Sequence, residues 1–545
     1  MDYYNLGSYS RTVNTQSAEA QKWFDRGLLW VYSYNHEEAI SCFEKALLED
    51  SECAMAHWGI AYAIGPNYNK PWEAFEDEEK PECIDRAHQA VHEATRLVSG
   101  ASGFEQDLIG ALALRYPESA SVTDFGTWND AYADAMRSVH TRHPEDLDVC
   151  ALFAEAIMNR TPWQLWDLPS GEPAEGADTL EAINVLDNAF ENLRGAWNHA
   201  GLLHMYLHLM EMSPHPERAL RHGDALATLV PDAGHLLHMP THVDVLCGDY
   251  QNVVSRNHNA IVADEQFAER TGRDNFYAVY RAHNYHFKVY GAMFLGQVSV
   301  ALEASEKLLS VISDDFMAEM ADWFEGFVPM KQHVLIRFGR WRDILQQEMP
   351  ADSDLYAVTT AMMRYARTVA LANLGDIDAA ESEKSEFYAA LERVPETRML
   401  FNNTCRDILG VAEQMLLGEL EYHKGNHDQA FTHLRKSVEI DDNLPYDEPW
   451  GWMQPTRHAL GALLIDQGRY EEAETVYRAD LGLDDTLSRA CQHPGNVWSL
   501  HGLHECLVRR GETAEALQVK LQLDKASARA EVPVRASCYC RQVAA

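Results

Sequence analysis

Basic residues are scarce in this sequence of 545 residues, which has 45 Lys and Arg against 84 Asp and Glu and a formal net charge of −39. This excess of negative charge repels phosphate backbones and anionic lipid headgroups, so we expect no nucleic-acid and no membrane partner. No stretch approaches the roughly 18 consecutive apolar residues of a membrane-spanning helix, and the first residues lack a basic segment followed by an apolar run. We therefore expect a soluble, cytoplasmic protein.

Several sequence motifs of known chemistry are also missing. No CxxC pair occurs among the ten cysteines, which argues against a zinc knuckle or a thioredoxin-like site. The sequence has no GxGxxG opening a helix, no GxxxxGK[ST] and no GxSxG, so dinucleotide, P-loop and serine-hydrolase chemistry lack support. Cys538 and Cys540 form a CxC pair, which is either a pair of thiolates that share one metal ion or two unrelated tail cysteines.

Strand-type alternation is missing as well, while apolar periods of three and four residues dominate. Small residues recur at the spacing of the tetratricopeptide unit, which is two antiparallel helices in about 34 residues. Glycine fits where the two helices cross closely and where the turn between them needs positive φ. We therefore predict an all-α, tetratricopeptide-like α-solenoid of antiparallel helix pairs. The clearest units carry Gly27, Tyr34, Ala39 and Phe43; Gly418, Gly425, Ala430 and Leu434; and Gly461, Gly468, Ala473 and Tyr477 at unit positions 8, 15, 20 and 24.

The sequence shows no low-complexity linker, so we expect residues 1–545 to form one solenoid. Within it we distinguish N-terminal repeats (1–160), His-rich central repeats (161–300), and C-terminal repeats with a tail (301–545).

Histidine is concentrated in the centre of the chain. Eleven of the 25 histidines lie within the 88 residues from His199 to His286, where uniform scattering would place about four. Units starting at Ala200, Gly234 and Ala282 put seven of them at positions 2, 5 and 9, which form one stripe of a first helix. In the tetratricopeptide fold this stripe faces the concave groove. The seven are His204, His208, His235, His238, His242, His283 and His286.

Imidazoles converging from neighbouring helices favour late first-row metal ions over Mg²⁺ or Ca²⁺, because neutral nitrogen suits borderline cations. The sequence therefore predicts a Cu, Zn or Fe site formed by the seven histidines in the groove. Two alternatives remain open, namely a polar groove for an organic ligand and purely structural histidines. Further residues have separate expectations: His199 is a ligand or a helix cap, Glu211 orients a histidine or is solvated, and His215, His222 and His258 lie on the surface.

Several strings resemble a family: residues 27–69, HAGLLHMYLHLMEMSPHPERAL (199–220), GHLLHMPTHVDVLCGDY (234–250) and HNYHF (283–287). They are similar to the bacterial and fungal tetratricopeptide proteins related to tetratricopeptide repeat protein 38, and NVWSLHGLHECL with RASCYCR resembles the fungal branch. The resemblance implies an α-solenoid and little chemistry.

Two functions follow from these patterns. The first is a metal-dependent enzyme, for example an oxidoreductase, acting on a small-molecule or peptide ligand in the groove. The second is a peptide- or protein-binding scaffold without catalysis. Because scaffold grooves generally present Lys, Arg or Asn and this groove presents imidazole, the sequence favours the enzyme.

Overall fold

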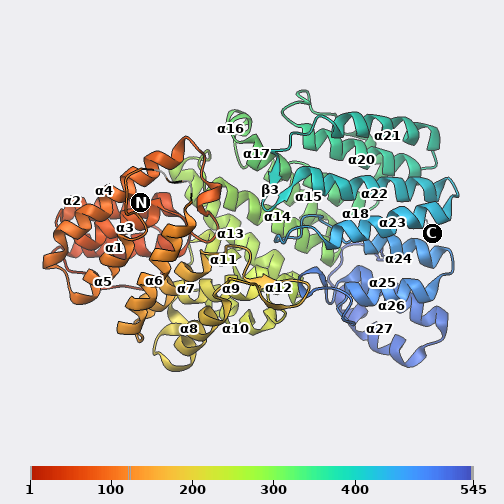
Figure 1. Ribbon diagram of the computed structural model, residues 1–545. Helices are drawn as coiled ribbons and strands as arrows, with labels where there is room; N and C mark the ends of the chain where they lie inside the picture. The colour runs from red at the N-terminus through yellow and green to blue at the C-terminus, as the bar shows by residue number, and fades with distance from the viewer. Residues whose placement is uncertain (1–2, 121, 123, 542–545) are drawn as a thin grey trace. The chain divides into compact units, whose positions relative to one another are not determined.

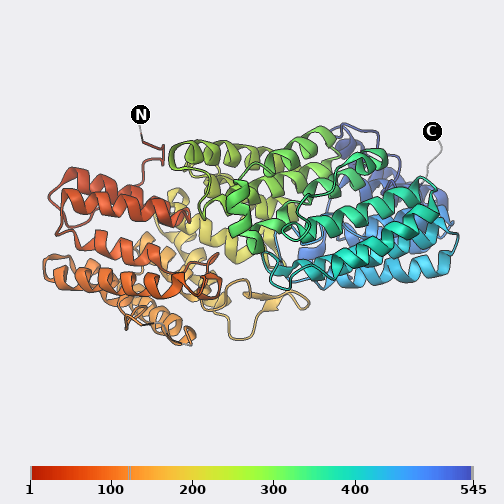
Figure 2. The same cartoon turned by 90° about the horizontal axis from the view of Figure 1, so that it is seen from above.

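The computed structural model describes residues 3–120, 122 and 124–541. It is all-α, as predicted, and consists of antiparallel helix pairs joined by turns and a few longer loops (Figures 1 and 2). The chain divides into two compact units, residues 1–243 and 244–545. The boundary between the two units lies inside residues 161–300, which are grouped together from the sequence as the His-rich central repeats.

The N-terminal unit begins with the helix pair α1 and α2. Its helices are α1 Ala18–Tyr32, α2 His36–Glu49, α3 Ala54–Ile64, η1 Trp72–Ala74, α4 Glu79–Leu97, η2 Val98–Gly100, α5 Gly103–Leu112, α6 Gly126–Arg142, α7 Leu147–Met158, α8 Thr179–Asn192, η3 Ala196–Asn198, α9 Ala200–Glu211, η4 Pro216–Ala219, α10 Leu220–Leu226 and α11 Gly234–His238, and α12 Pro240–Leu246 crosses into the next unit.

The C-terminal unit contains the most regular pairs. Its helices are α13 Tyr250–Thr271, α14 Ala278–Leu295, α15 Val298–Leu308, α16 Asp314–Glu319, α17 Ala321–Phe324, η5 Glu325–Phe327, α18 Met330–Arg337, α19 Trp341–Gln346, α20 Ala357–Asn373, α21 Ile377–Leu391, α22 Cys405–His423, α23 His427–Asp442, α24 Arg457–Asp466, α25 Tyr470–Asp480, η6 Arg489–Cys491, α26 Val497–Arg510 and α27 Thr513–Ser527.

Strand content is very small. In the described part of the chain, the named strands are two antiparallel pairs of two residues each, β1 Trp166–Asp167 with β2 Glu172–Pro173 and β3 Met399–Leu400 with β4 Asn403–Thr404. No helix among the described residues is both long and apolar enough to span a bilayer.

The predicted repeat register is visible in the packing of unit position 8 against position 24. A Cβ atom on Gly461 would lie 2.4 Å from the Tyr477 ring, and one on Gly418 would lie 2.7 Å from Leu434. Since real Cβ atoms do not approach this closely, only glycine lets the second helix cross the first at this distance. Gly27 repeats the relationship with the ring of Phe43 in the N-terminal unit.

Unit position 15 lies in the turn between the two helices. Gly425 and Gly468 have φ of 85° and 71° there. Tyr34 occupies the same position with φ of 54°, a left-handed conformation that costs a residue with a side chain about 1–2 kcal/mol. The first repeat therefore keeps a strained tyrosine where the other two keep glycine.

The His-rich segment departs from the predicted helices in two places. α9 and α11 begin at Ala200 and Gly234, as the register requires, but α14 begins at Ala278 rather than Ala282. The helix from Gly234 is interrupted at Met239, and α12 starts at Pro240, whose ring removes a backbone donor and opposes an uninterrupted helix.

Candidate functional site

The first histidine of the cluster caps helix α9. His199 Nδ1 accepts a hydrogen bond from the backbone N–H of Leu202 at 3.1 Å, and its Nε2 lies 3.1 Å from Asp148 Oδ1. Both ring nitrogens are therefore used, Nδ1 as the acceptor that caps the helix and Nε2–H as the donor of a hydrogen bond to Asp148. Of the two roles considered for His199, the structure supports the cap.

Three imidazoles from α9 and α11 converge in the N-terminal unit. His204, His208 and His235 each offer one ring nitrogen, and the three nitrogens lie within 4.8 Å of one another. The Nε2 atoms of His204 and His235 are 3.1 Å apart. Two nitrogen ligands at about 2.0–2.1 Å from one ion lie about 3.0–3.4 Å apart, so this pair already has ligand spacing.

Hydrogen bonds orient two of these rings. His204 Nδ1 lies 2.8 Å from the carbonyl oxygen of Tyr32, which can only accept, so Nδ1 carries the proton and Nε2 presents its lone pair. His208 Nδ1 lies 3.0 Å from Glu211 Oε1, which leaves His208 Nε2 as the lone-pair nitrogen. His208 Nε2 is fully buried and has no hydrogen-bond partner among the residues that the structure describes. A metal-ligating histidine usually gives its second ring nitrogen to a carboxylate or a carbonyl oxygen, as His208 does with Glu211.

Glu211 connects this cluster to the next pair of histidines. Its second oxygen, Oε2, lies 2.8 Å from His242 Nδ1. His242 Nε2 is in turn 2.7 Å from His238 Nε2. From the sequence, Glu211 is expected either to orient a histidine or to be a solvated carboxylate. In the structure it is buried between two imidazoles. It therefore orients His208 and His242 together.

Aromatic rings cover the three-histidine cluster. The Tyr34 ring centroid lies 4.6 Å from that of His204 and 5.5 Å from that of His235. Tyr68 and Trp163 lie against His208, with ring centroids 4.8 and 5.9 Å away. Aromatic residues of the same unit therefore enclose these histidines, which the repeat register places on the stripe facing the concave groove. Repeat spacing does not indicate this cover, since Tyr34 stands where the repeat ordinarily has a small residue.

Burial sets the protonation state of the cluster. Burial holds the pKa of His204, His208 and His235 well below the usual range. The imidazoles that neighbour each of these side chains lower its pKa further. All three side chains are therefore neutral at pH 7, which is the form that binds a metal ion.

The remaining two predicted ligands, His283 and His286, belong to the C-terminal unit. There the ring of His283 packs edge-on against Phe401, and His286 Nε2 lies 2.8 Å from Met453 Sδ. His333, which the sequence does not single out, is also buried in this unit, and burial lowers its pKa to about 3.

The three histidines placed off the stripe have different surroundings. His215 and His258 are exposed, as predicted. The prediction for His222 is wrong, because it is buried and stacks on Tyr206 and Trp197 with ring centroids 3.9 and 4.6 Å away. Its apolar cover comes from long-range packing that helical periodicity does not report.

Cys538 and Cys540 are joined by a disulfide. In this form their sulfurs are not thiolates, so the structure does not support the metal alternative for the CxC pair.

A sequence model of the tetratricopeptide repeat family matches residues 411–479, which span α22 to α25. The chain thus contains tetratricopeptide repeats where two of the clearest units are predicted. No curated protein matches the chain, so the narrower resemblance to tetratricopeptide repeat protein 38 receives no support.

Solved structures give distant matches. The Cut9–Hcn1 hetero-tetramer of the APC/C is 12% identical over 93% of this chain and 76% of that one, with a TM-score of 0.32. The human IFIT1 dimer with m7Gppp-AAAA is 11% identical over 93% and 97%, with a TM-score of 0.34. Naa15/Naa10 bound to HypK-THB is 14% identical over 93% and 70%, with a TM-score of 0.24.

Proposed function

We propose that this protein is a tetratricopeptide-type scaffold that binds peptide segments of partner proteins and whose N-terminal unit holds a structural transition-metal ion. The repeat match over residues 411–479 and the glycine-dependent helix crossings support the scaffold. Scaffold binding replaces the metal-dependent enzyme as the favoured function. His204, His208 and His235 are 0–1% exposed, so a substrate would reach an ion between them only if helices separated.

The metal proposal rests on one observation, the buried Nε2 of His208. Leaving a buried polar atom without a partner costs about 1–3 kcal/mol, and a metal ion beside His204 and His235 would remove that cost. The ion would be Zn, Cu or Fe, because the donors are neutral imidazole nitrogens. His204, His208 and His235 would hold it, while the Tyr32 carbonyl and Glu211 fix two of the rings. The neutral donor set and the carboxylate behind it fit such an ion.

Thermal unfolding of the full-length protein with and without a strong chelator tests this role. A ligand present at 100 times its dissociation constant stabilises the folded state by about 2.7 kcal/mol, so chelation should lower the unfolding midpoint measurably. His235→Ala should abolish the response to chelator. His215→Ala removes an exposed histidine from the same unit and should leave it unchanged. An identical midpoint with and without chelator, after reconstitution with Zn, Cu and Fe, would contradict the metal site and leave the scaffold in place.

A further inference from the structure

The last described residues of the chain return to the C-terminal unit after α27. The backbone N–H of Glu531 donates to the carbonyl of Gly296 at 3.1 Å. The Glu531 carboxylate accepts from the backbone N–H and the hydroxyl of Ser299 at 2.7 and 2.6 Å. Residues 529–541, which we call the tail, are therefore fixed at their start to the turn between α14 and α15.

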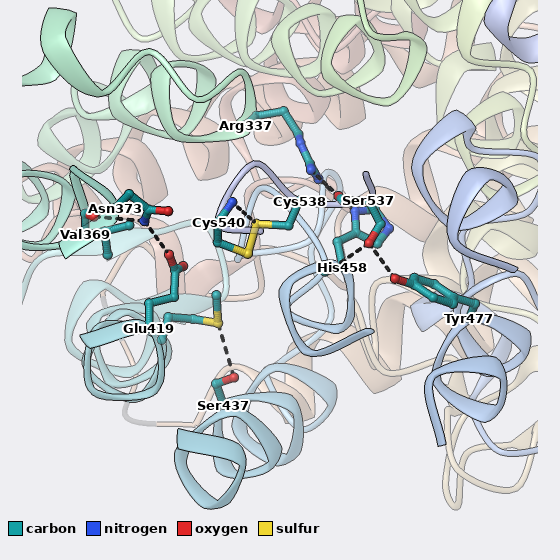
Figure 3. The surroundings of a disulfide bond; sticks show 11 residues. Arg337, Val369, Asn373, Glu419, Ser437, His458, Tyr477, Ser537, Cys538 and Cys540 are labelled. Carbon is teal, nitrogen blue, oxygen red and sulfur yellow. Dashed lines mark hydrogen bonds between the residues drawn. A yellow bond between two sulfur atoms is a disulfide. The ribbon is translucent and has the colours of Figure 1, made fainter. Parts of the chain in front are cut away.

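The middle of the tail is held by groups from three helices. Ser537 Oγ donates to the carbonyl of His458 at 2.8 Å and accepts from Tyr477 OH at 2.6 Å. The carbonyl of Ser537 accepts from the guanidinium of Arg337. Figure 3 shows these contacts, with the Cys538–Cys540 disulfide lying between them and the side chains of Asn373 and Glu419.

Arg337 is a buried cation that depends on the tail. Its side chain lies over the Trp498 ring, 4.1 Å from the centroid, and its Nη1 donates to His458 Nδ1 at 2.8 Å. Burial lowers its pKa to about 10. A buried guanidinium needs hydrogen-bond acceptors, and the backbone carbonyl of Ser537 is one of them. Arg337 therefore contacts the backbone carbonyl of Ser537, while the hydroxyl of the same residue is bound by His458 and Tyr477.

Two further anchors follow at alternate residues. The Tyr539 side chain lies against Gly339, where an added Cβ would come within 2.8 Å of the Tyr539 Cβ, and its ring is edge-on to Trp498. Arg541 makes a bidentate pair with Glu505, at 2.8 and 3.0 Å. Bidentate pairs add geometric specificity to their charge attraction. We call the groups that hold the tail the tail seat; they belong to Arg337, Gly339, His458, Tyr477, Trp498 and Glu505.

We propose that the tail seat is the peptide-binding surface of this scaffold and that the tail is its internal ligand. The partner is a peptide segment with a serine, an aromatic residue and an arginine at alternate positions, as in Ser537, Tyr539 and Arg541, and it competes with the tail. This inference rests on the proposed scaffold function and names the class of its partner. In the seat, Arg337 binds a backbone carbonyl, and Tyr477 and the carbonyl of His458 bind the serine hydroxyl. Gly339 and Trp498 contact the aromatic side chain, and Glu505 pairs with the arginine.

A labelled peptide of residues 529–541 tests the proposal on the full-length protein. In the wild-type chain the tail occupies the seat, so the peptide should bind weakly. Arg541→Glu places a carboxylate against Glu505 and weakens the tail, so the peptide should bind at least tenfold more tightly to this variant. The double variant Glu505→Arg with Arg541→Glu restores the charge pair within the chain and should exclude the peptide again. Arg535→Glu makes the same charge change at an exposed tail residue and should behave as wild type.

Two measurements keep the outcome decisive. Tyr539→Ala weakens the tail without a charge change and should also expose the seat, with folding checked by circular dichroism. Hydrogen exchange of residues 533–541 reports whether the tail has left. If Arg541→Glu and Tyr539→Ala both fold and neither binds the peptide, the proposal is overturned, whether the tail remains in place or not. If the chain instead forms dimers by exchanging tails, the occupant of the seat is the tail of a second copy. That result would contradict the proposal that a partner protein binds there.

A displayed library of random peptides, selected on the Arg541→Glu chain, separates this inference from the scaffold function. Selected peptides that the tail peptide displaces, with serine, aromatic and arginine at alternate positions, support both. Peptides that bind without being displaced would support the scaffold and contradict the tail seat. If the tail peptide binds but no library peptide does, the seat binds only the tail. That result would contradict the scaffold function and support the tail as an internal ligand.

Discussion

Tyr34 stacks on His235, with ring centroids 5.5 Å apart and ring planes 22° from parallel, while its own backbone is left-handed at φ 54°. The corresponding turn residues Gly425 and Gly468 have positive φ without a side chain. Strained backbone persists where surrounding structure requires it. The first repeat therefore accepts strain in its turn to place a ring over the histidine cluster.

Replacing Tyr34 by glycine should destabilise the protein. Glycine removes about 1–2 kcal/mol of backbone strain but deletes a buried ring worth about 3–5 kcal/mol, so the net loss should be about 1–4 kcal/mol. Tyr34→Phe keeps the ring and should stay closer to wild type. Urea unfolding of both variants measures the difference. A Tyr34→Gly protein more stable than wild type would show that the ring contributes little at this site.

Glu211 should act as a positioning residue for the proposed metal ligands. Glu211→Gln replaces one of two acceptor oxygens with an N–H₂ group, so His208 and His242 can no longer both donate to it. Loss of such an outer carboxylate lowers metal affinity by roughly 10–100-fold. Competition with a chromophoric chelator measures the affinity. The matched control is Glu217→Gln at an exposed glutamate beside His215, and equal affinities in the two variants would exclude the positioning role.

Stability should depend on pH through Glu419, whose pKa burial raises to about 7. The Glu419 carboxyl therefore binds its proton more tightly in the folded state than in the unfolded state, where its pKa is near 4.5. The free energy of unfolding consequently falls as pH rises from about 4.5 to 7. The contribution of this one group is about 2–3 kcal/mol between pH 4.5 and 8. Glu419→Gln should be less pH-dependent than wild type by that amount in urea unfolding. Parallel pH profiles for the two proteins would contradict the assignment.

Reduction of the Cys538–Cys540 disulfide should require the tail to open. Cys540 is fully buried and Cys538 is 8% exposed, so a small dithiol reaches the sulfurs slowly in the docked tail. Arg541→Glu weakens the docking and should accelerate reduction by dithiothreitol, whereas Arg535→Glu should not. Trapping free thiols with a maleimide at successive times measures the rate. Equal rates in all three proteins would show that the sulfurs are reached without tail opening.

Part of this structure is readable from the sequence because it depends on local spacing. Gly418 and Gly461 mark helix crossings, and the spacing of His204 and His208 places them on one side of α9. Periodicity gives the angular position of a side chain on its helix but not what covers that face. The cover by Tyr34, the burial of His222 and the tail contacts of Arg541 all depend on packing between distant segments, so spacing alone did not predict them.

The metal content of the purified full-length protein tests the proposed centre most directly. After reconstitution with zinc and removal of unbound ion, elemental analysis should find one zinc per wild-type chain. His208→Ala removes a buried nitrogen that no described residue hydrogen-bonds and should reduce the zinc content strongly, while His215→Ala should retain it. Equal zinc content in all three proteins, or none in any of them with zinc, copper or iron, would contradict a metal ion held by His204, His208 and His235.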